Sequence, residues 1–208
     1  MEEMPEFITQ QYIAPHPGKD DGHHGIDIAF FAEGDRPIIL GLPIHSILPG
    51  KVAAVLDNKG PYGNMINVET PLDHLPDKWK QQGLIPTLAP TVSSSGGLSC
   101  PANGELPTYD LNGDRSLYIL YAHLLDPPIY EVGDVISSCE VIGKVGNSGW
   151  SSDPHLHLEM RIGPENAIFG EIVHRVPATL EQTHNYCIWR ISNLFQLIDP
   201  MTLLSLYP

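Results

Sequence analysis

The sequence is poor in basic residues. Its 208 residues include only 11 Lys and Arg against 25 Asp and Glu, a formal net charge of −14. A nucleic-acid-binding protein needs a basic stripe to neutralise phosphates, and an anionic membrane surface would repel an acidic chain. We therefore expect no nucleic-acid partner. The acidity itself indicates little more than a well-solvated surface.

Long apolar runs and paired cysteines are also missing. No uncharged run approaches the ~20 residues of a membrane span, so no span is expected. The first ten residues, MEEMPEFITQ, lack the basic start and apolar core of a signal peptide. Either an export signal has been removed or the protein works without one. Cys100, Cys139 and Cys187 form no CxxC motif. Two of them could pair in an oxidising compartment, or all three could be isolated thiols.

Turn-forming residues, by contrast, are abundant, with 19 Gly and 20 Pro. This excess predicts many turns and short strands, and the length suits one domain with its own core. We predict a mainly β fold, a compact antiparallel sheet domain spanning 1–208 with a leading segment at 1–20. Apolar or alternating runs mark the expected strands at 24–32, 43–57, 64–70, 116–124 and 155–163. A tight hairpin pair is expected within 128–149, and one short helix in the tail, ending near Asp199-Pro200.

Residues 71–115 interrupt this pattern with a stretch rich in Ser, Gly and Pro. Loops of this length inside a compact domain are usually either functional or disordered. The segment is therefore predicted to be a long insertion within the domain. It could form a wall of a substrate groove or remain a passive surface loop.

The strongest chemical signal is the HxH motif of His155 and His157, in the sequence PHLHLE. Side chains two apart on a strand share one face, so the two imidazoles lie side by side while Leu156 and Leu158 face the other way. Neighbouring imidazoles are suited to binding a divalent transition metal. Glu159 follows on the same face, either as a partner that orients an imidazole or as a surface charge.

A second motif, HxxxD, places His23 and Asp27 four residues apart with Gly25 between them. The two side chains share a face, whereas His24 is out of register and should point away. HxxxD alone is weak evidence. Together with a distant HxH it describes a catalytic zinc site, which has three protein ligands and one open position.

A third motif, Tyr121-Ala122-His123-Leu124, ends an apolar strand, and His123 alone could equally be a core residue.

In this order, HxxxD, YAHL and GNSG…PHLHLE resemble the lysostaphin/LytM-type zinc endopeptidases, which cut peptidoglycan cross-links. The resemblance covers roughly residues 20 to 204, apart from the 71–115 segment. It implies that His23, Asp27 and His157 bind Zn²⁺ and that His123 and His155 are catalytic without binding the metal. Cys139, where the family usually has Gly, and Trp150-Ser151-Ser152-Asp153 depart from the family pattern. These departures concern the choice of substrate and leave the metal site complete.

The implied activity is hydrolysis of peptide bonds in peptidoglycan or its peptide fragments. Zinc-activated water would attack, one histidine acting as general base and the other stabilising the oxyanion. The family implies an extracytoplasmic location. Two alternatives stay open: a zinc peptidase or amidase on a non-wall substrate, and a catalytically silent member that binds wall or regulates another enzyme. The sequence does not predict an oligomeric state.

Overall fold

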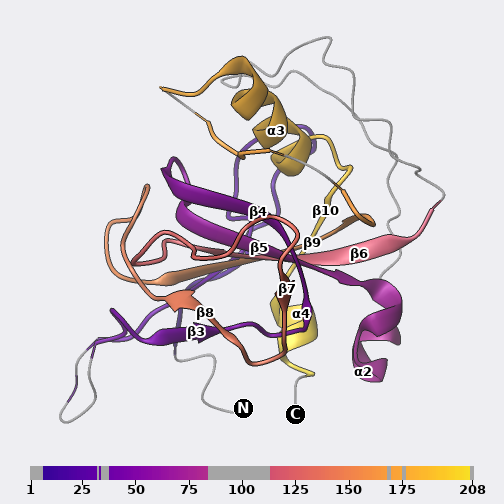
Figure 1. The fold of residues 1–208 in the computed structure, drawn as a ribbon, viewed down its shortest axis with the longest axis horizontal. Helices are drawn as coiled ribbons and strands as arrows, with labels where there is room; N and C mark the ends of the chain where they lie inside the picture. Colours follow the sequence, from indigo (N-terminus) through magenta and orange to yellow (C-terminus); the bar gives the residue numbers. More distant parts are fainter. Residues whose placement is uncertain are drawn as a thin grey trace.

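An antiparallel sheet of eight strands organises the chain, as the computed structural model shows (Figure 1). The structure describes residues 7–31, 33, 38–83, 113–167, 170–174 and 177–206. The strand order is β1-β2-β9-β6-β5-β4-β7, and β10 also pairs with β9. These strands are β1 (Ile8–Gln10), β2 (Ile26–Ile28), β4 (Gly50–Lys59), β5 (Gly63–Pro71), β6 (Arg115–Ala122), β7 (Val135–Ile136), β9 (Leu156–Pro164) and β10 (Gln196–Ile198). The predicted mainly β, antiparallel fold is confirmed.

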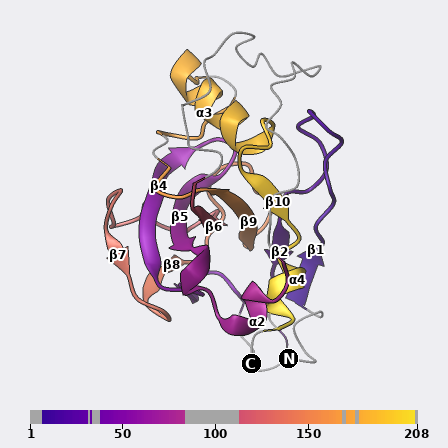
Figure 2. The same cartoon turned by 90° about the vertical axis from the view of Figure 1, so that its right-hand side faces the viewer.

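Each face of the sheet is covered by its own core cluster. On one face, apolar side chains of β6 and β9 pack with the small two-stranded sheet of β3 (Pro43–His45) and β8 (Val141–Lys144). The short helices α2 (Asp77–Lys80) and α4 (Met201–Leu204) close this core through Trp79, Leu203 and Leu204. On the other face lies α3 (Leu180–Arg190), which Figure 2 shows well away from α2 and α4.

Strand β9 lies in the middle of the sheet and fixes its register. It pairs with β6 on one side and with β2 and β10 on the other. The pairing places His157 directly opposite both Asp27 on β2 and Ala122 at the end of β6. Sheet register therefore joins the HxxxD, YAHL and HxH segments, which lie far apart in the sequence.

Two of the expected local structures are wrong. The strands β7 and β8 lie within 128–149 but do not pair with each other, because β7 extends the main sheet beside β4 and β8 pairs with β3. The tail helix begins earlier and ends at Arg190 rather than near Asp199. A capping box between Thr179 and Gln182 starts α3, and the residues before Asp199 form β10 against β9.

The expected insertion is only partly described. After β5 the chain forms the 3-10 turn η1 (Leu72–His74) and then α2, whose Trp79 is 1% exposed in the core. Residues 71–83 are thus an integral part of the fold. Residues 84–112, with Cys100, lie outside the described residues, and the prediction of a groove wall there stays a prediction.

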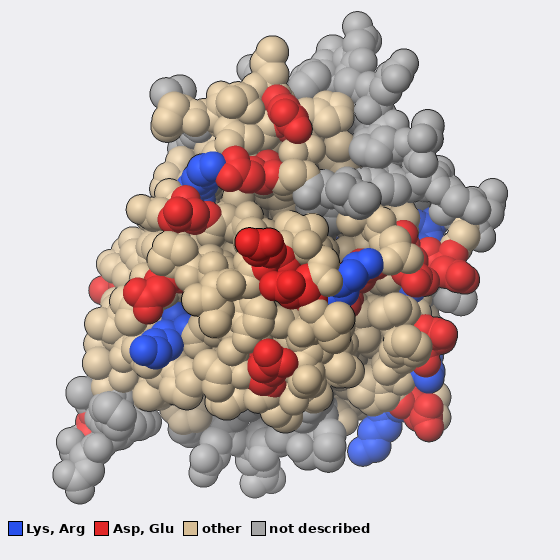
Figure 3. All heavy atoms as spheres, viewed as in Figure 1, with Lys and Arg blue, Asp and Glu red and all other residues tan. Residues whose placement is uncertain are grey.

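The molecular surface carries no basic stripe on the face in Figure 3, where the few Lys and Arg side chains stand apart and near acidic ones. The helices in the described part of the chain include no candidate for a transmembrane span. Of the cysteines, Cys139 is free and exposed, whereas Cys187 is a buried residue of α3.

Candidate metal centre and active site

Asp27 and His157 form the base of the candidate site as a cross-strand pair between β2 and β9. His157 Nδ1 lies 2.8 Å from Asp27 Oδ1, and His157 is only 6% exposed. Gly25 makes the close approach possible. A Cβ atom there would lie 2.2 Å from the carbonyl oxygen of Leu158 and 3.0 Å from the His157 ring. Any other residue would push the two strands apart.

His23 completes the group from the segment that leads into β2. Its Nε2 lies 3.1 Å from Asp27 Oδ1. Donor atoms of His23, Asp27 and His157 all lie within 4.8 Å of one another. The structure therefore brings together the three residues that were expected to bind the metal.

The hydrogen bonds of His23 test whether this group suits a cation. Its Nδ1 donates to the carbonyl oxygen of Gln11 at 2.9 Å, because a carbonyl can only accept. In the neutral ring Nε2 then carries a lone pair, which faces a carboxylate oxygen of Asp27. Two lone pairs in contact repel unless the ring is protonated or a cation lies between them. Two nitrogens and one carboxylate oxygen are suitable ligands for a divalent metal.

His157 has a carboxylate on each side of its ring. Its Nε2 lies 3.6 Å from Glu159 Oε2 and has no hydrogen-bond partner among the described residues. Burial lowers the pKa of His157, but Asp27 and Glu159 outweigh burial and raise the pKa overall. With Nε2–H directed toward Glu159, the lone pair of Nδ1 is left available to a metal. Carboxylates behind histidine ligands usually orient the ring in this way. Glu159 is 0% exposed, so it is not a surface charge.

His123 and His155 stand beside this group, with ring centroids 4.6 Å apart. His123 follows the last residue of β6 with a φ of 61°, and its backbone N–H donates to the carbonyl of Tyr62. Such left-handed backbone is costly for a non-glycine residue and is concentrated at functional sites. His155 precedes β9, and its Nε2 lies 3.6 Å from Asp27 Oδ2.

Both rings are held through Nδ1. His123 Nδ1 donates to the carbonyl of Ser148 at 2.8 Å, and His155 Nδ1 to the carbonyl of Asp153 at 2.8 Å. Each ring therefore keeps the lone pair of Nε2. Burial, together with the charge of His157, lowers the pKa of His123 to about 4. At neutral pH its Nε2 is a proton acceptor.

These side chains line one cleft of about 430 Å³. The cleft walls also include Tyr62, Trp150, Tyr186 and Arg190. Trp150 is half exposed and packs against Gly60, where a Cβ atom would lie 3.1 Å from the indole nitrogen. The cleft thus combines a candidate metal-binding group, two histidines with a free Nε2 lone pair and aromatic walls.

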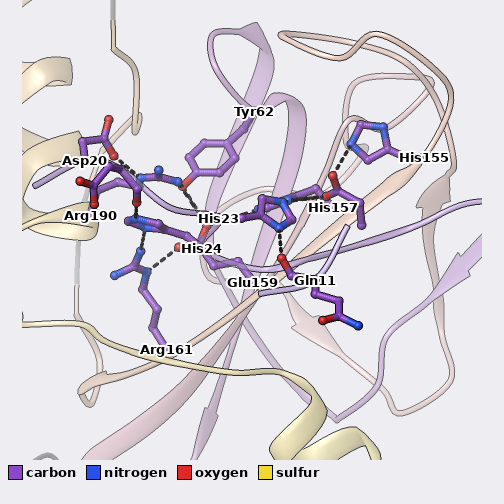
Figure 4. A network of polar contacts seen from close by, with 12 residues as sticks. Gln11, Asp20, His23, His24, Tyr62, His155, His157, Glu159, Arg161 and Arg190 are labelled. Carbon is purple, nitrogen blue, oxygen red and sulfur yellow. Dashed lines mark hydrogen bonds and ion pairs between the residues drawn. The ribbon is translucent and has the colours of Figure 1, made fainter. Parts of the chain in front are cut away.

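A buried polar network lies behind His157 on the α3 face of the sheet (Figure 4). Glu159 accepts hydrogen bonds from Arg161 Nε and from the hydroxyl of Tyr62. Arg161 Nη2 donates to His24 Nδ1 at 2.7 Å, and His24 Nε2 donates to the carbonyl of Asp21 at 3.0 Å. His24 belongs to this network and not to the candidate metal-binding group, as its register predicted.

Charge and burial decide the protonation states of the network. Burial raises the pKa of Glu159, but Arg161 and the other cations around it hold the pKa well below the usual range. Burial, reinforced by Arg190 and Arg161, lowers the pKa of His24 to about 2. The network therefore contains an ionised carboxylate and a neutral histidine.

Sequence reasoning missed the outer part of the network, in which Arg190 and Tyr186 on α3 contact Asp20. No spacing connects residue 20 with residues 186 and 190, so no sequence signal was available. Arg161 could have been found, because it continues the alternation of His157 and Glu159 on β9.

A histidine–aspartate–histidine donor set with two further histidines in one cleft is typical of metal-dependent hydrolases. The profile of Peptidase family M23 matches residues 107–168, which include the YAHL and HxH segments. This match covers less than a third of the chain and agrees with the family that the motifs resemble.

Several solved structures are similar to the chain at low identity. A variant of the catalytic domain of the prophage-encoded M23 protein EnpA from Enterococcus faecalis is 22% identical, with 77% of this chain and 84% of that chain covered and a TM-score of 0.42. The catalytic domain of lysostaphin from Staphylococcus simulans is 17% identical, with 98% and 96% covered and a TM-score of 0.47. A search of curated proteins finds no match.

Proposed function

We propose that the protein is a zinc-dependent endopeptidase that hydrolyses peptide bonds in bacterial peptidoglycan. The observation that carries the proposal is the convergence of His23, Asp27 and His157 beside His123 and His155 in one cleft. The match of residues 107–168 to a peptidase family supports the reaction class. The motif resemblance supports the wall substrate and an extracytoplasmic place of action.

His23 Nε2, an oxygen of Asp27 and His157 Nδ1 would hold the zinc ion. Bound there, zinc would supply a Lewis acid that lowers the pKa of water toward ~7 and polarises a carbonyl oxygen. The ligand set contains no cysteine, which favours a catalytic over a closed structural zinc site.

The chain's own residues move the protons. The lone pair on Nε2 of His123 or His155 accepts a proton from the attacking water. The ring that has gained a proton can then donate it to the leaving amine, and a protonated ring can also hydrogen-bond the developing oxyanion. The backbone carbonyls of Ser148 and Asp153 fix both tautomers throughout.

Zinc removal and restoration on purified peptidoglycan test the proposal. The chelated protein should release no peptide fragments, and stoichiometric zinc should restore release. Ordinary unstructured peptides serve as the substrate control and should be cut poorly. If the protein cuts ordinary peptides efficiently and leaves peptidoglycan uncut, it is a peptidase that acts on a non-wall substrate. A zinc-loaded, folded protein that cuts neither would be a silent member of the family.

A further inference from the structure

Among the described residues that line the cleft, Arg190 is the only Lys or Arg. It is the last residue of α3, on the side of the cleft formed with Tyr62 and Tyr186. Neither the proposed metal site nor the proton transfers described above use it. A cation placed in a peptidase cleft calls for an anionic or strongly accepting group on the substrate.

The guanidinium group is held in a fixed orientation. Its Nε donates to Asp20 Oδ1 at 2.7 Å and its Nη1 donates to the hydroxyl of Tyr62 at 3.3 Å. The group lies over the ring of Tyr186 at 5.6 Å from the centroid. A planar, delocalised cation held on two sides loses little conformational freedom when a ligand binds its remaining edge.

Nη2 has no hydrogen-bond partner among the described residues, and the neighbouring groups are already engaged. Asp20 Oδ2 accepts from the hydroxyl of Tyr186 at 2.8 Å, and the hydroxyl of Tyr62 donates to Glu159 at 3.0 Å. Asp20 and Glu159, whose Oε2 lies 3.9 Å from Nη1, offset part of the charge of Arg190 and so reduce its long-range attraction for an anion. Nη2 is therefore the nitrogen of Arg190 that can still donate a hydrogen bond to a substrate group.

We propose that Arg190 binds a carboxylate of the peptide substrate and makes the enzyme selective for peptides with a free carboxylate near the cut bond. This inference rests on the proposed function. Peptides carry carboxylates at acidic side chains and at their C-termini, and arginine is suited to bind them. A carboxamide in the same place keeps an acceptor oxygen but loses the charge.

Paired substrates test the inference without changing the protein. Soluble wall peptides are prepared with free carboxylates, and half of the preparation is converted to carboxamides by carbodiimide coupling to ammonia. The protein should cut the free form with a kcat/KM about 10-fold to 100-fold higher, mainly through KM, the usual size for a hydrogen bond to a charged group. Arg190→Gln should lose this preference while keeping its zinc content.

Two variants control the experiment. Arg190→Lys keeps the charge but lacks the planar guanidinium, so it should keep only part of the preference. If Arg190→Gln does not fold, Arg190→Lys is the variant that tests the inference. Lys144→Gln changes an exposed cation on β8 that does not line the cleft, and it should leave the preference unchanged.

Each other outcome overturns the inference. Equal cleavage of the two forms by the unmodified protein would show that no carboxylate is recognised. A preference that survives in Arg190→Gln would place the recognition elsewhere. If the zinc-loaded protein cuts neither form, the proposed function fails first and the inference fails with it.

Discussion

The two faces of β9 are equally buried and opposite in chemistry. Leu158, Met160 and Ile162 point into an apolar core shared with β6. His157, Glu159 and Arg161 point to the α3 face, and Glu159 is as completely buried as Met160. One strand thus separates a face that stabilises the fold from a face that supports the candidate site.

The difference shows what a buried polar layer requires. An unpaired buried charge is strongly destabilising, whereas a buried apolar side chain needs no specific partner. On the polar face both charged side chains are therefore hydrogen-bonded. Glu159 accepts from Arg161 and Tyr62. Arg161 also donates to His24 and to the carbonyl of Phe195. We expect changes on this face to affect the metal, and changes on the apolar face to affect stability alone.

The largest effect should come from His157→Ala on the polar face. The variant loses a nitrogen that we propose binds the metal, so it should lose stoichiometric zinc and all measurable peptide release. Metal analysis after dialysis and a wall-digestion assay measure the two effects. Tight zinc binding with near-normal turnover would show that His157 is not a ligand.

His123→Ala should separate catalysis from metal binding. Its ring stands beside the donor group but not within it. The variant should keep most of its zinc and lose about 10²-fold or more in kcat, the usual scale for general acid–base groups. Loss of zinc from a folded variant would make His123 a ligand and contradict the assigned roles.

Met160→Ala tests the apolar face at the same depth of burial. Truncation leaves a cavity in the core, so the free energy of unfolding should fall by about 2–5 kcal/mol. Denaturant titration measures the loss, and zinc stoichiometry in the folded variant should not change. A variant of normal stability that loses zinc would abolish the distinction between the faces.

Glu159→Gln sharpens the same comparison, since it changes charge and hardly changes volume. Removing a carboxylate behind a histidine ligand typically weakens metal affinity by about 10-fold to 100-fold. Competition with a chromophoric chelator measures the affinity. Unaltered zinc affinity would mean that Glu159 only neutralises the charge of Arg161 and does not orient His157.

The smallest expected effect is the contribution of His24 to the pH dependence of the free energy of unfolding. Its pKa is lowered from 6.5 to about 2 in the folded protein, so between these values the unfolded chain binds the extra proton. Its contribution to stability is therefore present above pH 6.5 and decreases as the pH falls. Acidification from pH 7.5 to 5.5 should cost about 1.4 kcal/mol from this residue alone.

Unfolding curves at both pH values should show that loss in the unchanged protein and a smaller one in His24→Gln. Identical pH slopes in the two proteins would contradict the burial of a neutral His24.

The sequence predicted most residues of the candidate site, but few of the contacts between distant segments that surround it. Alternation in HLHLEMRIG predicted β9 and its polar face, and three motifs predicted the residues that the register of β2, β6 and β9 brings together. Contacts between distant segments, such as Asp20 with Arg190, have no periodicity that could reveal them. The same limit explains β7 and β8, whose partners are β4 and β3 rather than each other.

Mass spectrometry of the products from purified peptidoglycan tests the central claim most directly, because it reports substrate and bond together. With zinc-loaded protein, the account predicts fragments that have gained one water at a peptide bond, with a new amino and a new carboxyl terminus. The same digestion with His157→Ala should give none of them. Unchanged peptidoglycan, or fragments cut only at sugar linkages, would contradict the claim.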